Sequence, residues 1–122
     1  MKIIIPFIKN VAIFTALFLL PFFVTISNAQ LIGWQYYVPV VVKENSGLPV
    51  TNHQVLIQFN TQTPIAAGKM NVDASDFRVG QDNMGTSLLN FWIESGVNTT
   101  ATKVWVKIPS IAANDSVVIY FF

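Results

Sequence analysis

The chain of 122 residues contains no cysteine. Disulfides, thiolate metal sites and cysteine nucleophiles are therefore excluded. Small exported domains often depend on disulfides for their stability. A domain of this size buries only a modest share of its unfolded surface. The stability of this chain must therefore come from apolar burial or from contact with neighbouring domains.

Charged side chains are also scarce, at 11% of the sequence, with seven basic and six acidic residues. Lys2 and Lys9 lie in the first ten residues, so five basic and six acidic groups remain after them, a net charge near −1. These basic residues form no cluster along the chain. Because affinity for nucleic acid depends on neutralising phosphates, we exclude nucleic acid as a partner.

A secretory signal peptide is predicted at the N-terminus. The basic start is followed by residues 11–24, which carry no charge, and then by the small-residue tripeptide Ser27-Asn28-Ala29. This order is typical of a signal peptide cleaved after Ala29, and the apolar core is shorter than the roughly 20 residues of a membrane span. The alternative is an uncleaved N-terminal anchor, because residues 3–8 lengthen the apolar stretch.

The predicted domains are accordingly a signal peptide over residues 1–29 and one exported domain over residues 30–122. Secretion or display at the cell surface follows from this division. Contact with a membrane is expected only through the signal segment before cleavage.

The exported part has the pattern of an all-β protein. Short segments rich in Val, Ile, Phe, Tyr and Trp alternate with turns that contain Gly, Asn and Asp. The predicted strands cover residues 36–43, 53–60, 76–80, 87–94, 102–108 and 116–122. Several of them alternate apolar and polar residues, as in an antiparallel sheet with one dry face. We therefore predict a small antiparallel β-sandwich, jelly-roll or Ig-like, with one helical turn within residues 63–71.

The last predicted strand, residues 116–122, is apolar on both faces. Such a strand should lie in the centre of a sheet or be covered by another part of the protein. Because no sequence follows it, we expect either a domain that is cut short or one that packs against a partner.

Several stretches of the exported part resemble a known family. They are WQYYVPV (34–40), NSG (45–47), IAAGKM (65–70), DASDFRV (73–79), LLNFWIESG (88–96), TKVWVKIP (102–109) and VIY (118–120). In this order they resemble the bacterial and archaeal domain-of-unknown-function family 2341. The resemblance implies an exported surface protein, often with concanavalin-like lectin modules beside it, and it assigns no catalytic residue. Because the family usually continues its last strand with a Tyr-Gly extension, the ending Phe121-Phe122 suggests truncation at the C-terminus.

Two tryptophans are the most informative candidates for binding. The alternation of their strands places Trp92 and Trp105 on the more polar face, together with Glu94, Lys103 and Lys107. Antiparallel pairing of the two strands would bring Glu94 opposite Lys103. Exposed indoles beside polar groups can stack on sugar rings or anchor a partner protein. In the alternative interpretation a second layer covers both rings, which then belong to the core.

Acidic residues offer two weaker candidates. Asp73, Asp76 and Asp82 could supply the oxygen ligands that Ca²⁺ prefers, although Asp in such loops more often caps turns. No other cofactor is expected. Glu94 and Asp76 could serve as paired carboxylates in a small glycoside-type hydrolase, but a domain of this size lacks material for a deep cleft. We therefore predict a protein that is not an enzyme.

The sequence thus predicts an exported, non-catalytic β-sandwich module of a cell-surface protein, with a role in carbohydrate binding or adhesion. Its expected partner is a polysaccharide or a neighbouring domain of the same surface protein. A purely structural module that packs against such a domain is the first alternative, and a small hydrolase is the second.

Overall fold

The computed structural model describes residues 31–122, so the predicted signal peptide over residues 1–29 lies outside the described residues. The described part contains six strands and one short helix. In chain order they are β1 (Val38–Lys43), β2 (Val50–Phe59), α2 (Gln62–Ala66), β3 (Val79–Gly80), β4 (Phe91–Ser95), β5 (Thr102–Ile111) and β6 (Ser116–Phe121). None of the helices described over residues 31–122 is long and apolar enough to span a membrane.

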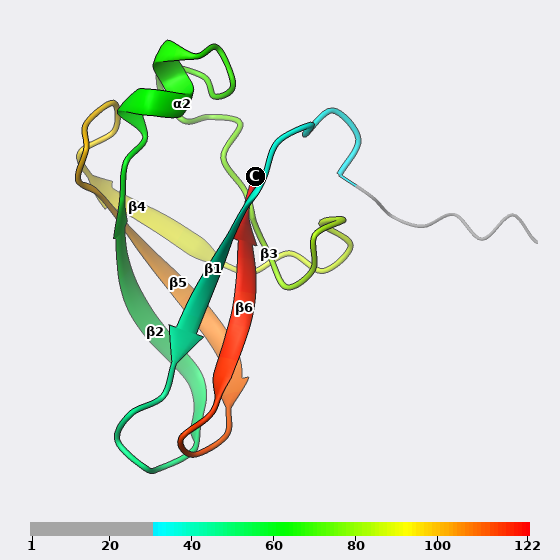
Figure 1. Cartoon of the computed structure of the whole chain (residues 1–122), viewed down its shortest axis with the longest axis vertical. Helices are drawn as coiled ribbons and strands as arrows, with labels where there is room; N and C mark the ends of the chain where they lie inside the picture. Colours follow the sequence, from blue (N-terminus) through cyan, green and yellow to red (C-terminus); the bar gives the residue numbers. More distant parts are fainter. Residues whose placement is uncertain (1–30) are drawn as a thin grey trace, which may run out of the picture.

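The strands form two antiparallel sheets of three strands each, in the orders β1-β6-β3 and β2-β5-β4 (Figure 1). The two central strands, β5 and β6, are consecutive in the chain but belong to different sheets. The central position of β6 confirms the prediction made from its two apolar faces. The predicted class, a small all-β antiparallel sandwich, is confirmed as well.

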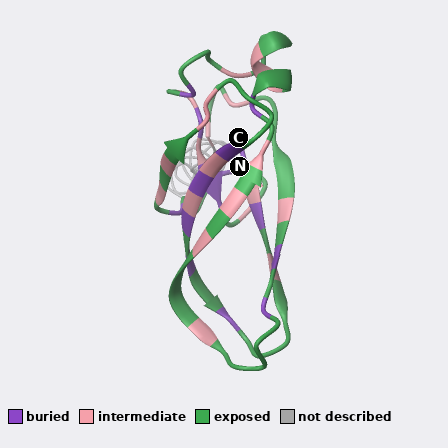
Figure 2. Ribbon diagram, turned by 90° about the vertical axis from the view of Figure 1, so that its left-hand side faces the viewer, coloured by how far each residue is buried: buried purple, intermediate pink, exposed green. Residues whose placement is uncertain are grey.

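The core lies between the two sheets and follows from the alternation of side chains along the strands. On β5, Val104, Val106 and Ile108 are buried, and on β6 Ile119 and Phe121 are buried. Buried and exposed positions alternate along the strands, as Figure 2 shows. Burial of each such side chain stabilises the fold by roughly 1.5–3 kcal/mol relative to exposure. In the absence of disulfides, this apolar layer is the main source of stability.

Aromatic rings close the end of the core nearest α2. Phe77, which precedes β3, is 1% exposed. Its ring centroid lies 5.5 Å from that of Phe59, 5.1 Å from that of Phe91 and 5.1 Å from that of Phe121. These partners belong to β2, β4 and β6, so one side chain joins the two sheets. Aromatic pairs at these separations add to the stability that burial alone supplies.

The strand ends differ from the prediction in several places. The predicted strand over residues 76–80 is reduced to Val79–Gly80, because the Asp76 side chain accepts hydrogen bonds within the preceding turn. The predicted strand over residues 87–94 begins only at Phe91. In contrast, β2 begins before its predicted start and β5 continues beyond its predicted end, so that Val50 pairs opposite Ile111. The helical turn expected within residues 63–71 is present as α2.

Candidate functional site

The outer face of the β2-β5-β4 sheet carries the two tryptophans. Trp92 on β4 lies directly opposite Trp105 on β5 in the antiparallel register. Trp92 is 62% exposed, and Trp105 is partly buried. The alternation therefore placed both side chains on the correct face of the sheet. The alternative in which both rings belong to the core is wrong, because no second layer of residues 31–122 covers Trp92.

The pairing expected between Glu94 and Lys103 is wrong. The register of β4 and β5 shifts between Ile93 and Ser95, so that Ser95 lies opposite Lys103. Such a bulge re-aims the side chain of the extra residue. The Glu94 carboxylate accepts a hydrogen bond of 2.8 Å from Nε1 of Trp105 instead. This bond orients the indole of Trp105 and satisfies its one polar group.

Around the tryptophans the face is hollowed into a shallow concavity of about 570 Å³. Its lining comprises Gln54, Asn90, Phe91, Trp92, Glu94, Trp105 and Lys107. Four of the five residues predicted for ligand binding are therefore brought together. Lys103, the fifth, does not line the concavity.

Sequence reasoning missed two polar residues of this site. Gln54 of β2 lies opposite Lys107 of β5, and the carbonyl oxygen of Asn90 accepts a hydrogen bond of 2.9 Å from the Lys107 N–H. A signal for both was present, since the alternation of their segments placed Gln54 and Asn90 on the polar face. The pairing of β2 with β5 was needed to join Gln54 to the tryptophans.

Two of the three aspartates considered for calcium stabilise the turn before β3. Asp73 accepts a hydrogen bond of 3.0 Å from the Ser75 N–H. Hydrogen bonding to Ser75 also lowers the pKa of Asp73. Both carboxylate oxygens of Asp76 lie 3.0 Å from the Asn71 N–H. These carboxylates act as turn caps in the way that short acidic side chains usually do.

Asp82 organises the next loop. Its carboxylate accepts hydrogen bonds from the N–H groups of Met84, Thr86 and Ser87 and from the Thr86 hydroxyl. Partial desolvation opposes ionisation, but the bonds from Thr86, Met84 and Ser87 outweigh it and lower the pKa of Asp82. Within residues 31–122 no group of three His, Cys, Asp or Glu residues is arranged to hold a metal ion. The structure therefore does not bring the three aspartates together as a calcium site.

The carboxylates considered for hydrolysis are also not brought together. Glu94 lines the concavity beside the tryptophans, whereas Asp76 lines a different cavity of about 380 Å³ near Trp34. A paired-carboxylate mechanism needs both groups on the two sides of one scissile bond. Glu94 and Asp76 do not form such a pair in the structure.

The protein is a small all-β module, and one of its sheets carries an aromatic outer face with polar groups at its edge. Residues 73–122 match the model of the family described as Domain of unknown function (DUF2341), which confirms over these residues the resemblance found in the sequence. The match extends over β3 to β6 and includes Trp92, Glu94, Trp105 and Lys107. No curated protein and no solved structure matches the chain.

Proposed function

We propose that the chain is an exported, non-catalytic module of a cell-surface protein that binds polysaccharide through the outer face of the β2-β5-β4 sheet. One observation carries the proposal. Trp92 leaves 62% of its surface exposed beside a concavity with polar groups at its edge. An indole that is kept in water at this position is available for a ligand with apolar faces and polar edges.

Sugar rings have that chemistry, because their C–H faces are apolar and their hydroxyl groups project from the edges. Trp92 supplies a flat ring for stacking, and Trp105 is held in place by its bond to Glu94. The Glu94 carboxylate has further lone pairs for sugar hydroxyls. Gln54 and Lys107 lie on the same face and can donate hydrogen bonds. The combination of one platform with several short polar contacts is suited to a neutral polysaccharide.

Retention on a panel of insoluble and soluble polysaccharides tests the proposal. The full chain is expressed in an exporting bacterial host, and mass spectrometry of the product shows whether cleavage follows Ala29. We expect one class of polymer to retain the folded protein, and Trp92→Ala to weaken retention by about tenfold or more, as removal of a central aromatic anchor does. Val118→Ala, which truncates an exposed residue of the other sheet, is the matched control.

Far-UV circular dichroism on each sample checks that the variants are folded. A folded wild-type protein that ignores every polymer contradicts the proposal. Retention of Trp92→Ala at the wild-type level contradicts the assignment of the site. Loss of folding by Trp92→Ala would place the indole in a structural role that its exposure does not predict.

The outer face of the β1-β6-β3 sheet favours a second candidate, a structural module that packs against a neighbouring domain. Val41 and Val118 lie opposite each other in the register of β1 and β6, and they are 65% and 43% exposed. Leu88, bridged to Gly80 at the edge of the same sheet, is 49% exposed. An apolar patch of this kind is typical of an interaction surface. The isolated chain should then self-associate as its concentration rises, and Val118→Lys should abolish the association in sedimentation experiments. A wild-type protein that stays monomeric at every concentration would remove this candidate.

A further inference from the structure

A third and larger cavity lies between the start of β1, the helix α2 and the end of β6. Its volume is about 770 Å³, within the range of about 300–1,000 Å³ that small-molecule sites occupy. Tyr36, Tyr37 and Val38 form part of its wall and are 51%, 47% and 62% exposed. Large apolar side chains thus remain open to solvent around a space large enough for a ligand.

The floor of this cavity is the aromatic cluster of the core. Phe59, Phe77 and Phe121 all line it. The ring centroids of Phe59 and Phe121 lie 4.8 Å apart, and Phe77 is 5.5 Å from Phe59. Tightly packed rings give the cavity a rigid apolar base. A ligand that fills it must therefore have an apolar body that gains by leaving water.

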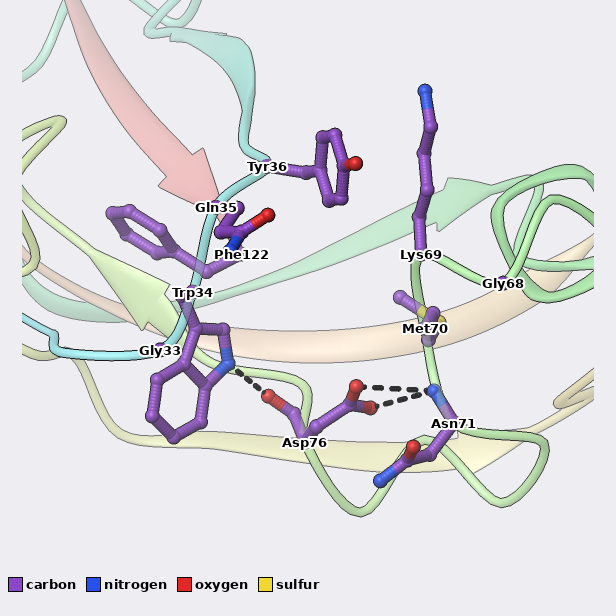
Figure 3. Close-up of a pocket in the computed structure, with 10 residues that line it drawn as sticks. All are labelled: Gly33, Trp34, Gln35, Tyr36, Gly68, Lys69, Met70, Asn71, Asp76 and Phe122. Carbon is purple, nitrogen blue, oxygen red and sulfur yellow. Dashed lines mark hydrogen bonds between the residues drawn. The ribbon is translucent and has the colours of Figure 1, made fainter.

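Lys69 carries the one charged side chain among the residues that line the cavity. Its Nζ lies 4.7 Å from the centroid of the Tyr36 ring. Both residues also line the adjacent cavity of about 380 Å³. Figure 3 draws that smaller cavity and shows the two side chains beside each other. Asp76 lines only that smaller cavity, and its carboxylate is bonded to the Asn71 N–H. The larger cavity therefore combines an apolar interior with a single positive group.

We propose that this cavity binds a single-chain amphiphile with an apolar tail and a carboxylate head. The tail covers the aromatic floor, and the carboxylate pairs with the Lys69 ammonium. A charge-assisted bond to the head is stronger than a bond between neutral groups, so the lysine selects anionic amphiphiles over cationic ones with the same tail. This ligand class differs from the polysaccharide of the opposite sheet, and the two sites share no lining residue.

Nuclear magnetic resonance titration with dodecanoate, kept below its micelle concentration, tests the inference on the exported product of the full chain. Trp34 lines the adjacent small cavity, whereas Trp92 and Trp105 lie on the other sheet. We expect dodecanoate to shift the indole N–H signal of Trp34 and to leave those of Trp92 and Trp105 in place. Dodecyltrimethylammonium, with the same tail and the opposite charge, should bind at least about tenfold more weakly.

Substitutions separate the roles of head and tail. Lys69→Gln should weaken dodecanoate binding by about tenfold or more, since it removes a bond to a charged group, and Lys69→Arg should retain binding. Lys107→Gln makes the same charge change on the other sheet and should have no effect. Ala67→Trp places a large side chain at the cavity wall and keeps Lys69. This variant should block the binding of dodecanoate.

Three results would overturn the inference. The first is equal affinity for the anionic and cationic amphiphiles, and the second is unchanged binding by Lys69→Gln. The third is binding that begins only at the micelle concentration, which would indicate a response to a lipid surface. Backbone amide spectra of each variant show that it is folded, so that loss of binding reflects the site.

Discussion

A chain of buried hydrogen bonds next to the β4–β5 connection provides a sharp test of the structure. Thr61 and Thr102 are 1% and 0% exposed, and their hydroxyl oxygens lie 2.6 Å apart. The Thr102 hydroxyl donates to the carbonyl of Gly96 at 2.7 Å, and the Thr61 hydroxyl accepts from the Asn98 N–H at 2.9 Å. Since the proton of Thr102 is directed to Gly96, Thr61 must donate to Thr102.

This direction of donation predicts the effect of each substitution. Thr102→Val leaves the buried Thr61 hydroxyl without an acceptor, which should cost about 1–3 kcal/mol of unfolding free energy. The carbonyl of Gly96 keeps a partner, because the Thr99 hydroxyl also donates to it at 2.6 Å. Thr61→Val leaves the Asn98 N–H without its acceptor and should cost a similar amount.

The double variant should therefore be no less stable than Thr61→Val alone, because the hydroxyl that Thr102→Val leaves unpaired is then absent. The coupling should be about 1 kcal/mol or more in favour of the double variant, within the range seen for groups in one network. Urea unfolding followed by circular dichroism measures the free energy of unfolding of the wild type, the two single variants and the double variant. The comparison is valid if the slope of this free energy against urea concentration is the same for all four proteins. Additive costs would refute the assigned direction of donation.

Three further predictions concern stability. Hydrogen bonds from Ser46, Asn114 and Gly47 lower the pKa of Glu44 from 4.5 to about 2. The contribution of Glu44 to the free energy of unfolding should therefore be fully present above pH 4.5 and be lost as the pH falls toward 2. Glu44→Gln should flatten this decline in acid-unfolding curves, and an unaltered curve would show that other groups cause it. Gly96→Ala should be more destabilising than Gly68→Ala in thermal unfolding, since both positions have positive φ, but only at Gly96 would the new Cβ meet a backbone oxygen, that of Ala101, at 2.9 Å; equal losses would contradict the close contact. Phe77→Ala should reduce the free energy of unfolding by about 3–5 kcal/mol, as other large-to-small core changes do, and a loss below about 1 kcal/mol would contradict its place between the sheets.

Much of the fold could be predicted from local pattern. Segments of alternating apolar and polar residues located all six strands and assigned the inner face of β5, where Val104 and Val106 are fully buried. The two apolar faces of β6 predicted its central position. Strand ends were less predictable, because hydrogen bonds of side chains such as Asp76 decide where the turn before β3 stops.

The site required information that local pattern does not hold. Alternation placed Trp92 and Trp105 on one face, but it could not show whether another layer covers that face. The partner of Glu94 was wrong because a bulge in β4 shifts the register by one residue, and no residue in the segment signals it. The larger cavity was missed because its lining comes from β1, α2 and β6, which only the tertiary structure brings together.

The central claim is that polysaccharide binds over Trp92 and Trp105. The most direct test is to titrate the protein with an oligosaccharide from the polymer that retains it, and to follow the indole N–H signals of its three tryptophans. The account predicts that the signals of Trp92 and Trp105 shift together with the same affinity, while that of Trp34 stays in place. A shift of Trp34 alone, or none at any concentration that saturates retention, would contradict it.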